Sequence, residues 1–309
     1  MNSFKNTDNI LIIGGTGFIG RHLTEKCLSS TSNVVCIGLA QKDPFKGRAE
    51  VLRADIGNRE QLQSILRNRV FHYVFNLGGY IDHTHYFKGG RKVIETHLSG
   101  LMNLVDCLDT ERLHGFVQVG SSDEYGAQPA PQKETMREMP IAPYSFAKAA
   151  ATHFIQTLAG TEGFPGVVLR PFLVYGPGQD EKRFLPQVIR GCLADEEFKT
   201  SEGRQLRDFC YIDDVVEAMV RAALLPSVKG RVVNVGSGTP VSIREVIRKA
   251  VELAGGGRPL WGAHPYRKGE NMELYADVTL AKSLLSWEAV TGLDEGLKRT
   301  IEYYKRISK

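Results

Sequence analysis

The chain has 309 residues, of which 42% are hydrophobic and 24% are charged, and its net charge is +4. This is an ordinary composition for a globular protein with one large domain or two coupled ones. No block of Lys or Arg indicates a nucleic-acid partner, and no apolar run approaches the roughly 20 residues of a membrane helix. The polar first nine residues lack the apolar stretch of a signal peptide. Five cysteines without C-x-x-C pairing or metal-ligand spacing favour a reduced, cytoplasmic protein with no metal site.

Apolar runs alternate with helical patterns in the first half of the chain. The run 9–15 predicts a buried strand, and residues 20–30 place apolar side chains on one helical face. Further strands are predicted at 33–39, 73–79, 115–122 and 166–172. Further helices are predicted at 59–67, 92–108 and 145–159. This alternation predicts an α/β fold of the Rossmann type, a doubly wound parallel sheet covered by helices on both faces.

The alternation loosens after about Gly176. We therefore expect residues 1–176 to form the main domain and residues 177–309 to form mainly a smaller C-terminal lobe. The two parts are expected to interleave. The segment of about 205–240 should return to the main domain, because RVVNVGS at 231–237 has the pattern of a buried strand.

The predicted helix 92–108 is apolar nearly all round. Such a helix must be covered on two sides. The sheet can cover one side. The other side is covered either by the same chain or by a partner subunit, and the sequence leaves both open.

Three glycines follow the first predicted strand, at Gly14, Gly17 and Gly20. Glycine permits a tight turn and lets backbone N–H groups approach a pyrophosphate closely, and the start of the following helix adds a favourable field. A strand that leads through such glycines into a helix predicts a dinucleotide-binding turn.

The end of the second predicted strand indicates which dinucleotide is bound. An NAD-preferring site usually has a carboxylate there to bind the ribose 2′-OH, but this chain has Gly38 and Leu39, and its next acid is Asp43. Three basic residues lie near enough to meet a 2′-phosphate: Lys42, Arg48 and Arg53. The sequence therefore favours NADP(H) over NAD(H). Asp55 and Ile56 are placed to contact the adenine, although Asp55 could instead be the N-cap of the next helix.

The segment YSFAK puts Tyr144 and Lys148 on one face of a predicted helix. An ammonium beside a phenol stabilises the phenolate, so we expect Lys148 to lower the pKa of Tyr144 toward neutrality. Tyr144 would then exchange a proton with a substrate oxygen. The pair alone also fits an ordinary amphipathic helix. The segment VGSSDEYG at 119–126 adds a hydroxyl, Ser121, at the end of an apolar strand, where it can hold the same oxygen.

Taken in order, the motifs resemble those of the extended short-chain dehydrogenase/reductases, in the NAD(P)-dependent nucleotide-sugar epimerase/dehydratase family. The resemblance covers roughly residues 10–287 and is carried by GGTGFIG, ADIGN, GSSDEYG, YSFAK, LRPFLVYGPGQ, RDFCYIDD and YRKGENMELYAD. It implies a Rossmann domain that binds NAD(P) and a C-terminal lobe that binds a nucleoside-diphosphate sugar. It also implies a homodimer formed by the helix 92–108 and the helix that carries Tyr144.

The resemblance also implies roles for individual residues. It makes Ser121 the catalytic Ser/Thr, Tyr144 the acid/base, and Lys148 its electrostatic partner and a ribose ligand. It assigns cofactor contacts to the glycine turn and to residues after later strands: Gly14, Gly17, Phe18, Ile19, Gly20, Asp55, Ile56, Leu77, Gly78, Pro171 and Phe172. Arg207 and Arg267 resemble arginines that clamp the substrate diphosphate, a task that suits the guanidinium fork.

Departures from the family pattern bear on the reaction. Ser122 and Asp123 stand where 4,6-dehydratases commonly have Asp-Glu or Ser-Glu, so the elimination base is one methylene shorter. Leu173 and His97 each occupy a place where Asn is common, which implies an altered fit to the sugar or the cofactor.

Because a reductase draws hydride from the reduced pool, the preference for NADP(H) favours reduction of a 4-keto-6-deoxy sugar nucleotide. A 4,6-dehydratase or a 4-epimerase, each of which recycles its own cofactor, remains an alternative. A non-catalytic NAD(P) sensor or scaffold is disfavoured, because Ser121, Tyr144 and Lys148 are all present. His83 and His85 follow the third predicted strand, where one of them would serve as an extra acid/base; ordinary core or surface histidines are the favoured interpretation.

Overall fold

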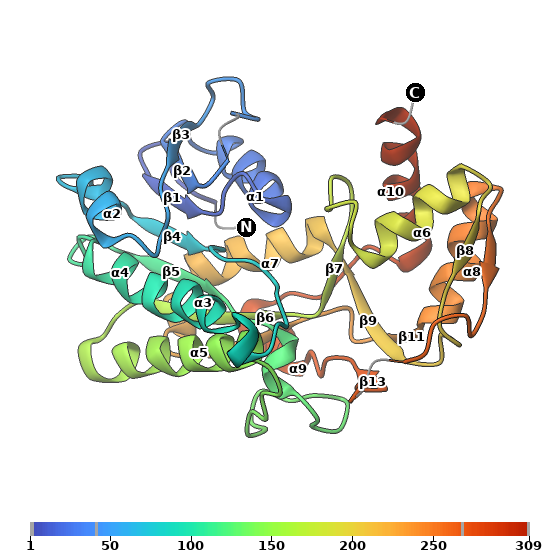
Figure 1. Cartoon of the computed structure of the whole chain (residues 1–309). Coiled ribbons are helices and arrows are strands. Elements are labelled where there is room, and N and C mark those ends of the chain that lie inside the picture. Colours follow the sequence, from blue (N-terminus) through green and yellow to red (C-terminus); the bar gives the residue numbers. More distant parts are fainter. Residues whose placement is uncertain (1–2, 41–42, 267–268, 308–309) are drawn as a thin grey trace.

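The computed structural model describes residues 3–40, 43–266 and 269–307 (Figure 1). At its centre lies a seven-stranded parallel sheet with the order β10-β6-β5-β4-β1-β2-β3. The strands of this sheet are β1 Ile10–Ile13, β2 Val34–Gly38, β3 Glu50–Arg53, β4 Tyr73–Asn76, β5 Gly115–Val119, β6 Gly166–Pro171 and β10 Val232–Val235. The chain is thus a Rossmann-type α/β protein, as predicted.

Helices cover both faces of this sheet (Figure 1). One face carries α1 Phe18–Leu28 and α7 Ile212–Leu224. The other carries α2 Arg59–Leu66, α4 Gly100–Asp106 and α5 Pro143–Glu162. The side chains of β1 show how the two layers form: Ile10 and Ile12 enter one core cluster, while Leu11 and Ile13 enter the other. A strand buried on both faces in this way reads as a continuous apolar run.

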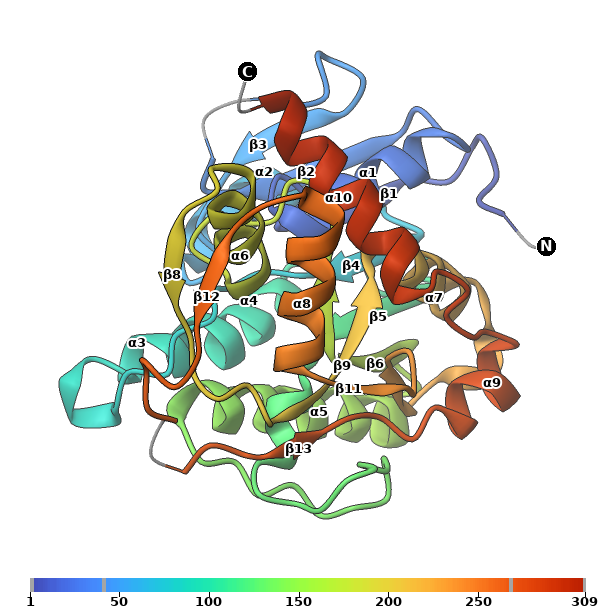
Figure 2. The ribbon, with the colours of Figure 1, turned by 90° about the vertical axis from the view of Figure 1, so that its right-hand side faces the viewer.

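A smaller part of the molecule is built beside the carboxyl ends of the strands. Its four-stranded sheet has the order β11-β9-β13, with β7 also paired to β9, and a two-stranded sheet joins β8 to β12. These strands are β7 Leu173–Tyr175, β8 Glu197–Lys199, β9 Leu206–Tyr211, β11 Pro240–Ser242, β12 Arg258–Leu260 and β13 Glu273–Leu274. Figure 2 shows α8 beside α6 and α10 in this part. The helices of this part are α6 Phe184–Leu193, α8 Ile243–Ala254 and α10 Leu293–Ile307, whereas α9 Thr279–Leu285 packs on β10 and α7 of the main domain.

The segment 205–240 is divided between the two parts. Its first strand, β9, belongs to the small sheet, whereas α7 packs on β5 and β6, and β10 extends the main sheet. The chain therefore crosses from the small sheet back to the large one, and the two share a continuous core.

The long helix that was expected over 92–108 is interrupted. It consists of α3 Arg91–Ile94, a π-helical turn at Glu95–Ser99 and α4. Such wide turns are rare and are often found at functional sites. Here the turn carries His97, which is buried.

Among the described residues, no helix combines the length and the apolar character that crossing a bilayer would require.

Candidate active site

The glycine turn between β1 and α1 has no room for a Cβ at Gly14, Gly15 or Gly20. Gly14 has φ +75°, and a Cβ at Gly20 would lie 2.1 Å from the Gly14 carbonyl oxygen. α1 begins after Gly17 with no side-chain cap and with no acidic residue in its first turn. The first N–H groups of the helix and its positive end are therefore left for an anion. This turn fits a dinucleotide pyrophosphate.

The other expected cofactor residues lie at the same edge of the sheet. Phe18 and Ile19 are half-buried in the first turn of α1. Leu77 and Gly78 come directly after β4, and a Cβ at Gly78 would lie 2.8 Å from the Ile13 side chain. Because the carboxyl ends of parallel strands meet at one edge, these residues frame one ligand-binding crevice.

Asp55 and Ile56 follow β3 at this edge. Ile56 is buried, and Asp55 is exposed, with one carboxylate oxygen accepting the Gly57 N–H at 2.9 Å. The N-cap of α2 is Asn58, which accepts from the Gln61 N–H at 3.0 Å. The alternative of Asp55 as the N-cap is therefore wrong, because the helix begins three residues later.

The end of β2 carries no acid that faces a ribose. Leu39 follows the strand and is 65% exposed. The Asp43 carboxylate is engaged by its own loop, since its oxygens accept the N–H groups of Phe45 and Gly47 at 2.7 Å each. Arg48 is also engaged, in a two-bond ion pair with Glu25. Of the three expected basic residues, Lys42 lies outside the described residues, and Arg53 is exposed at the end of β3.

Ser121, Tyr144 and Lys148 meet beside this crevice. Ser121 follows β5, and its hydroxyl accepts the Asp123 N–H at 3.1 Å. Tyr144 and Lys148 lie in α5, with the Lys148 Nζ 5.9 Å from the centre of the Tyr144 ring. Both side chains are only 4% exposed. The three groups can therefore act on one substrate oxygen from a site that largely excludes water.

Burial dominates the electrostatics of this group. It raises the pKa of Tyr144 well above its usual range, and the Asp123 carboxylate adds to this effect. A hydrogen bond with Ser121 and the charge of Arg183 act in the opposite direction. Burial also lowers the pKa of Lys148 to about 8. The Lys148 Nζ donates to the Val119 carbonyl at 2.7 Å. The expectation that the pKa of Tyr144 moves toward neutrality is therefore not met, because burial raises this pKa and outweighs the nearby positive charge.

Two histidine rings contact Tyr144 edge-on. The His97 ring lies 5.3 Å from the Tyr144 ring, and its Nε2 donates to the Tyr80 carbonyl at 2.9 Å. Burial lowers the pKa of His97 to about 3, so this ring is neutral. The His83 ring lies 5.5 Å from Tyr144, and its Nε2 is 3.7 Å from Asp123 Oδ2. His85 is exposed. His83 is exposed, in line with a surface histidine, and its ring also lies beside Tyr144.

Asp123 connects this group to the small sheet. Burial raises its pKa, while the charges of His83, Arg207 and Arg183 oppose that rise. Arg207 is buried in β9 and forms an ion pair with Glu270 at 2.5 Å. The guanidinium is therefore held at the border of the site by a carboxylate.

The remaining expected residues are less closely grouped. Ser122 is buried in the turn after Ser121, and Leu173 is half-buried on β7. Pro171 ends β6, and the Phe172 ring packs in a small cluster with Tyr125 and Ala276. Arg267 lies outside the described residues.

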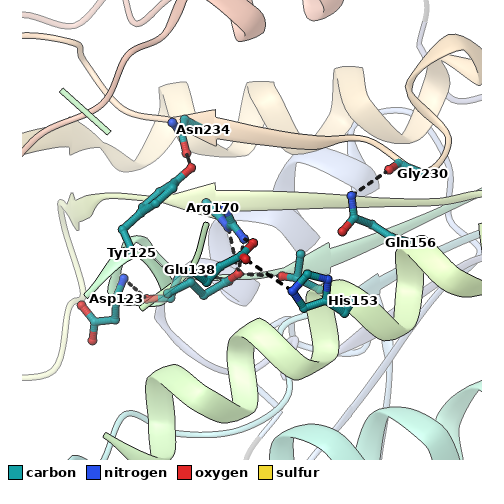
Figure 3. A network of polar contacts seen from close by, with 11 residues as sticks. Asp123, Tyr125, Glu138, His153, Gln156, Arg170, Gly230 and Asn234 are labelled. Carbon is teal, nitrogen blue, oxygen red and sulfur yellow. Dashed lines mark hydrogen bonds and ion pairs between the residues drawn. The ribbon is translucent and has the colours of Figure 1, made fainter. Parts of the chain in front are cut away.

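A buried ionic network lies under the site (Figure 3). Glu124 is fully buried. Its Oε1 accepts the Ser121 N–H at 2.8 Å, and its Oε2 accepts Arg170 Nε and Thr152 Oγ1 at 2.8 Å each. Arg170 also pairs with Glu138, which lies 3.3 Å from His153 Nε2. Sequence reasoning missed Glu124, although the Ser-x-x-Glu spacing is that of a capping box.

Arg183 and Glu270 were also missed. Arg183 precedes α6, and Glu270 lies three residues after Arg267 in the motif YRKGENMELYAD. This motif was the signal that could have found Glu270, whereas Arg183 has no local pattern that distinguishes it from a surface charge. Only the fold brings both residues near Asp123 and Arg207.

The chain is similar over nearly its whole length to known nucleotide-sugar enzymes. A 323-residue alignment with a UDP-glucose 4-epimerase of Mycolicibacterium smegmatis shows 29% identity over 97% of this chain and 99% of that protein. A dTDP-glucose 4,6-dehydratase of Xanthomonas campestris pv. campestris is 26% identical over 95% and 92% of the two chains. The solved structure of MoeE5 with UDP-glucuronic acid and NAD is 30% identical, with a TM-score of 0.87, over 97% of this chain and 99% of that one.

The family pattern described as the NAD dependent epimerase/dehydratase family matches residues 10–236. That span contains the glycine turn, Ser121, Tyr144 and Lys148. The chain is therefore an enzyme that belongs to the NAD-dependent epimerase/dehydratase family of extended short-chain dehydrogenases/reductases.

Proposed function

We propose that this enzyme reduces the keto group at C4 of a 4-keto-6-deoxy nucleoside-diphosphate sugar, with NADPH as the hydride source. The observation that carries the proposal is the closeness of Ser121, Tyr144 and Lys148 at the edge of the sheet that also carries the glycine turn. Relatives whose names include nucleotide-sugar epimerases and dehydratases support a nucleotide sugar as the substrate.

Each of the three residues has a separate task in this reaction. Bound NADPH supplies hydride to the sugar carbon. Tyr144 gives its proton to the sugar oxygen, for which its high pKa is suitable, because a neutral phenol is the proton donor that reduction needs. Ser121 holds the same oxygen through its hydroxyl. Lys148 contributes a positive charge in a site of low dielectric, where it favours the phenolate that the proton transfer leaves.

The proposed preference for NADPH rests on the residues that follow β2 at the edge of the sheet. A carboxylate that accepts the ribose 2′-OH would repel a 2′-phosphate. The first acid after β2, Asp43, is turned into its own loop. The exposed Arg53 is available to a phosphate. MoeE5 was solved with NAD, so a measured preference between the two cofactors bears directly on this point.

The substrate would lie between the large and small sheets, with its diphosphate near Arg207 and Arg267. We further propose that two copies of the chain associate through the helical segment 91–106 and α5. Met102 and Phe146 on these helices are 44% and 49% exposed, which leaves apolar surface for a partner.

A second candidate is 4-epimerisation or 4,6-dehydration with a retained cofactor. The names of the relatives favour it, and the partly buried Asp123 beside His83 offers a candidate proton acceptor. Both reactions would begin with oxidation at C4, with bound oxidised nicotinamide as the hydride acceptor and the same three residues acting on the C4 hydroxyl.

One assay separates these functions. Purified protein is mixed with NADPH and a 4-keto-6-deoxy nucleotide sugar, and absorbance of the reduced nicotinamide is followed. The proposal predicts stoichiometric loss of NADPH and formation of the 4-hydroxy sugar. If NADPH is not consumed, and the protein instead forms a 4-keto product or a 4-epimer from an ordinary nucleotide sugar, the reductase proposal is wrong and the second candidate takes its place.

A further inference from the structure

The proposed reduction consumes one proton from solvent in every turnover. Tyr144 gives its proton to the substrate and must receive another before the next cycle. The Tyr144 side chain is only 4% exposed, so water does not reach it freely. A route for the proton must therefore pass through a neighbouring side chain. The need for this route rests on the proposed function, because only a net reduction takes up a proton.

Two neighbours of Tyr144 point inward. Lys148 is buried, and its ammonium donates to the Val119 carbonyl. His97 is buried, stays neutral and donates its Nε2 proton to the Tyr80 carbonyl. Neither side chain reaches solvent, so neither connects Tyr144 directly with the bulk.

His83 is placed differently. Its side chain is 48% exposed, and its ring contacts the Tyr144 ring at 5.5 Å with an interplanar angle of 77°. Its Nε2 faces Asp123 Oδ2 at 3.7 Å. A carboxylate beside an imidazole fixes the orientation of the ring. Histidine is also the side chain whose charge changes most readily near neutral pH.

We propose that His83 returns a proton from solvent to Tyr144 after each reduction, with Asp123 as the positioning residue that holds the imidazole. Tyr144 first gives its Oη proton to the C4 oxygen, which completes a hydroxyl and leaves a phenolate. The imidazolium N–H bond of His83 then breaks, and its proton passes to the phenolate oxygen, directly or through one water. Neutral His83 finally takes a proton from water.

Charges from several elements act on this relay. Asp123 and Glu124 lie in the turn after β5, Lys148 lies in α5, Arg183 precedes α6, and Arg207 lies in β9. The charges of Arg183 and Arg207 oppose the rise in the pKa of Asp123 that burial causes.

The test measures steady-state reduction by the full-length protein with NADPH and a 4-keto-6-deoxy nucleotide sugar. We expect His83→Ala to lower kcat by about 10-fold or more, with KM changed far less, because it removes a proton-transfer step. His85→Ala, two residues away in the same exposed loop, should leave kcat unchanged. Thermal unfolding of both variants checks that the fold is kept.

Chemical rescue separates proton transfer from a structural role. Added imidazole should restore most of the lost rate of His83→Ala, and substituted imidazoles should do so in proportion to their acidity. The relay is overturned if His83→Ala keeps the wild-type kcat, or if kcat falls and no imidazole restores it. Either result leaves the proposed reductase function intact. Wild-type protein that forms a 4-epimer or a 4-keto product without consuming NADPH would overturn both proposals, because those reactions need no net proton.

Discussion

Tyr144 and Lys148 lie one turn apart on α5, and the ammonium of Lys148 donates to the Val119 carbonyl while its Nζ stays 5.9 Å from the Tyr144 ring centre. The lysine thus contributes a nearby positive charge without a hydrogen bond to the phenol. Tyr144 rests as a neutral acid, and the charge of Lys148 becomes useful only once the phenol has lost its proton. The two residues should therefore respond differently to substitution.

The first prediction concerns the Tyr144 hydroxyl. Tyr144→Phe removes one oxygen from a side chain that otherwise fills its place, so the fold should persist. We expect NADPH-dependent turnover to fall on the order of 10²–10⁴-fold, the usual contribution of a positioned acid/base. Tyr80→Phe is the matched control, because its ring is 41% exposed and the substitution keeps both the carbonyl that accepts from His97 and the ring that lies 6.4 Å from the His97 ring. Turnover that survives Tyr144→Phe would show that another group protonates the substrate.

The second prediction concerns the loss of folding stability that comes from burying the Lys148 ammonium. In the folded protein, burial lowers the pKa of Lys148 from 10.5 to about 8. Below pH 8 the folded protein must bury a charged ammonium, which lowers the free energy of unfolding. Between about pH 8 and 10.5 only the unfolded chain still binds this proton, so the free energy of unfolding rises with pH and the cost disappears. Lys148→Met should therefore abolish catalysis yet unfold at higher urea concentration than the wild type at pH 7.

The stability gain of Lys148→Met should shrink between pH 8 and pH 10. Urea titrations at both pH values, on protein without added nucleotide, measure the difference between the two chains. Other titrating groups are common to both chains and cancel in the comparison. A gain that is equal at both pH values would mean that Lys148 is neutral, or well solvated, in the folded protein.

Much of this site could be predicted because its signals are local. The run Ile10–Ile13 is apolar on both faces, and the glycines after it have a spacing that few other structures require. Tyr144 and Lys148 need only a helix to share a face. These features depend on neighbours within a few residues, which is the range over which sequence patterns are informative.

Other features depend on contacts that the local sequence does not encode. β3, Glu50–Arg53, is a half-exposed edge strand without an apolar run, and it was not expected. The π-helical turn at 95–99 interrupts a sequence that is regularly helical. His83 reaches Tyr144 only because the loop after β4 folds over α5. In each case the tertiary structure decides what the local propensities leave open.

The third prediction tests the glycine turn. A Cβ at Gly20 would lie 2.1 Å from the Gly14 oxygen and 2.7 Å from the Gly15 Cα, and neither backbone atom can move away. Gly20→Ala should destabilise the fold by about 1–3 kcal/mol and abolish the thermal shift caused by NADPH. Gly160→Ala in α5 is the control, because nothing lies within 4 Å of a Cβ there. It should stabilise the protein by up to about 1 kcal/mol and keep the thermal shift.

The fourth prediction tests the cofactor. Leu39→Asp places a carboxylate directly after β2, where it can accept the ribose 2′-OH of NADH and repel the phosphate of NADPH. The ratio of kcat/KM for NADPH to that for NADH should fall by about 10-fold or more, since one such electrostatic contact is worth at least ~1.4 kcal/mol. Leu39→Asn has the same shape without the charge and should change the ratio far less. Equal effects of the two variants would mean that charge at this edge does not select the cofactor.

The last prediction concerns the network beneath Ser121. Glu124 is fully buried and accepts hydrogen bonds from Arg170, Thr152 and the Ser121 backbone. Glu124→Gln keeps the shape but leaves a buried guanidinium short of one counter-charge, which should cost about 3 kcal/mol of unfolding free energy. Glu50→Gln is the control, because the Glu50–Arg69 pair is equally well aligned but exposed, and should cost less than ~1 kcal/mol.

Glu124→Gln should also reduce kcat at temperatures where the protein remains folded, because the Ser121 N–H loses its charged acceptor and the hydroxyl loses its fixed position. Urea titration and turnover at about 25 °C measure the two effects separately. A variant that loses stability but keeps the wild-type kcat would show that the network supports the fold alone, and that Ser121 is held by its strand and by its bond to the Asp123 N–H. A loss of both is expected, because one carboxylate serves the buried arginine and the catalytic serine at once.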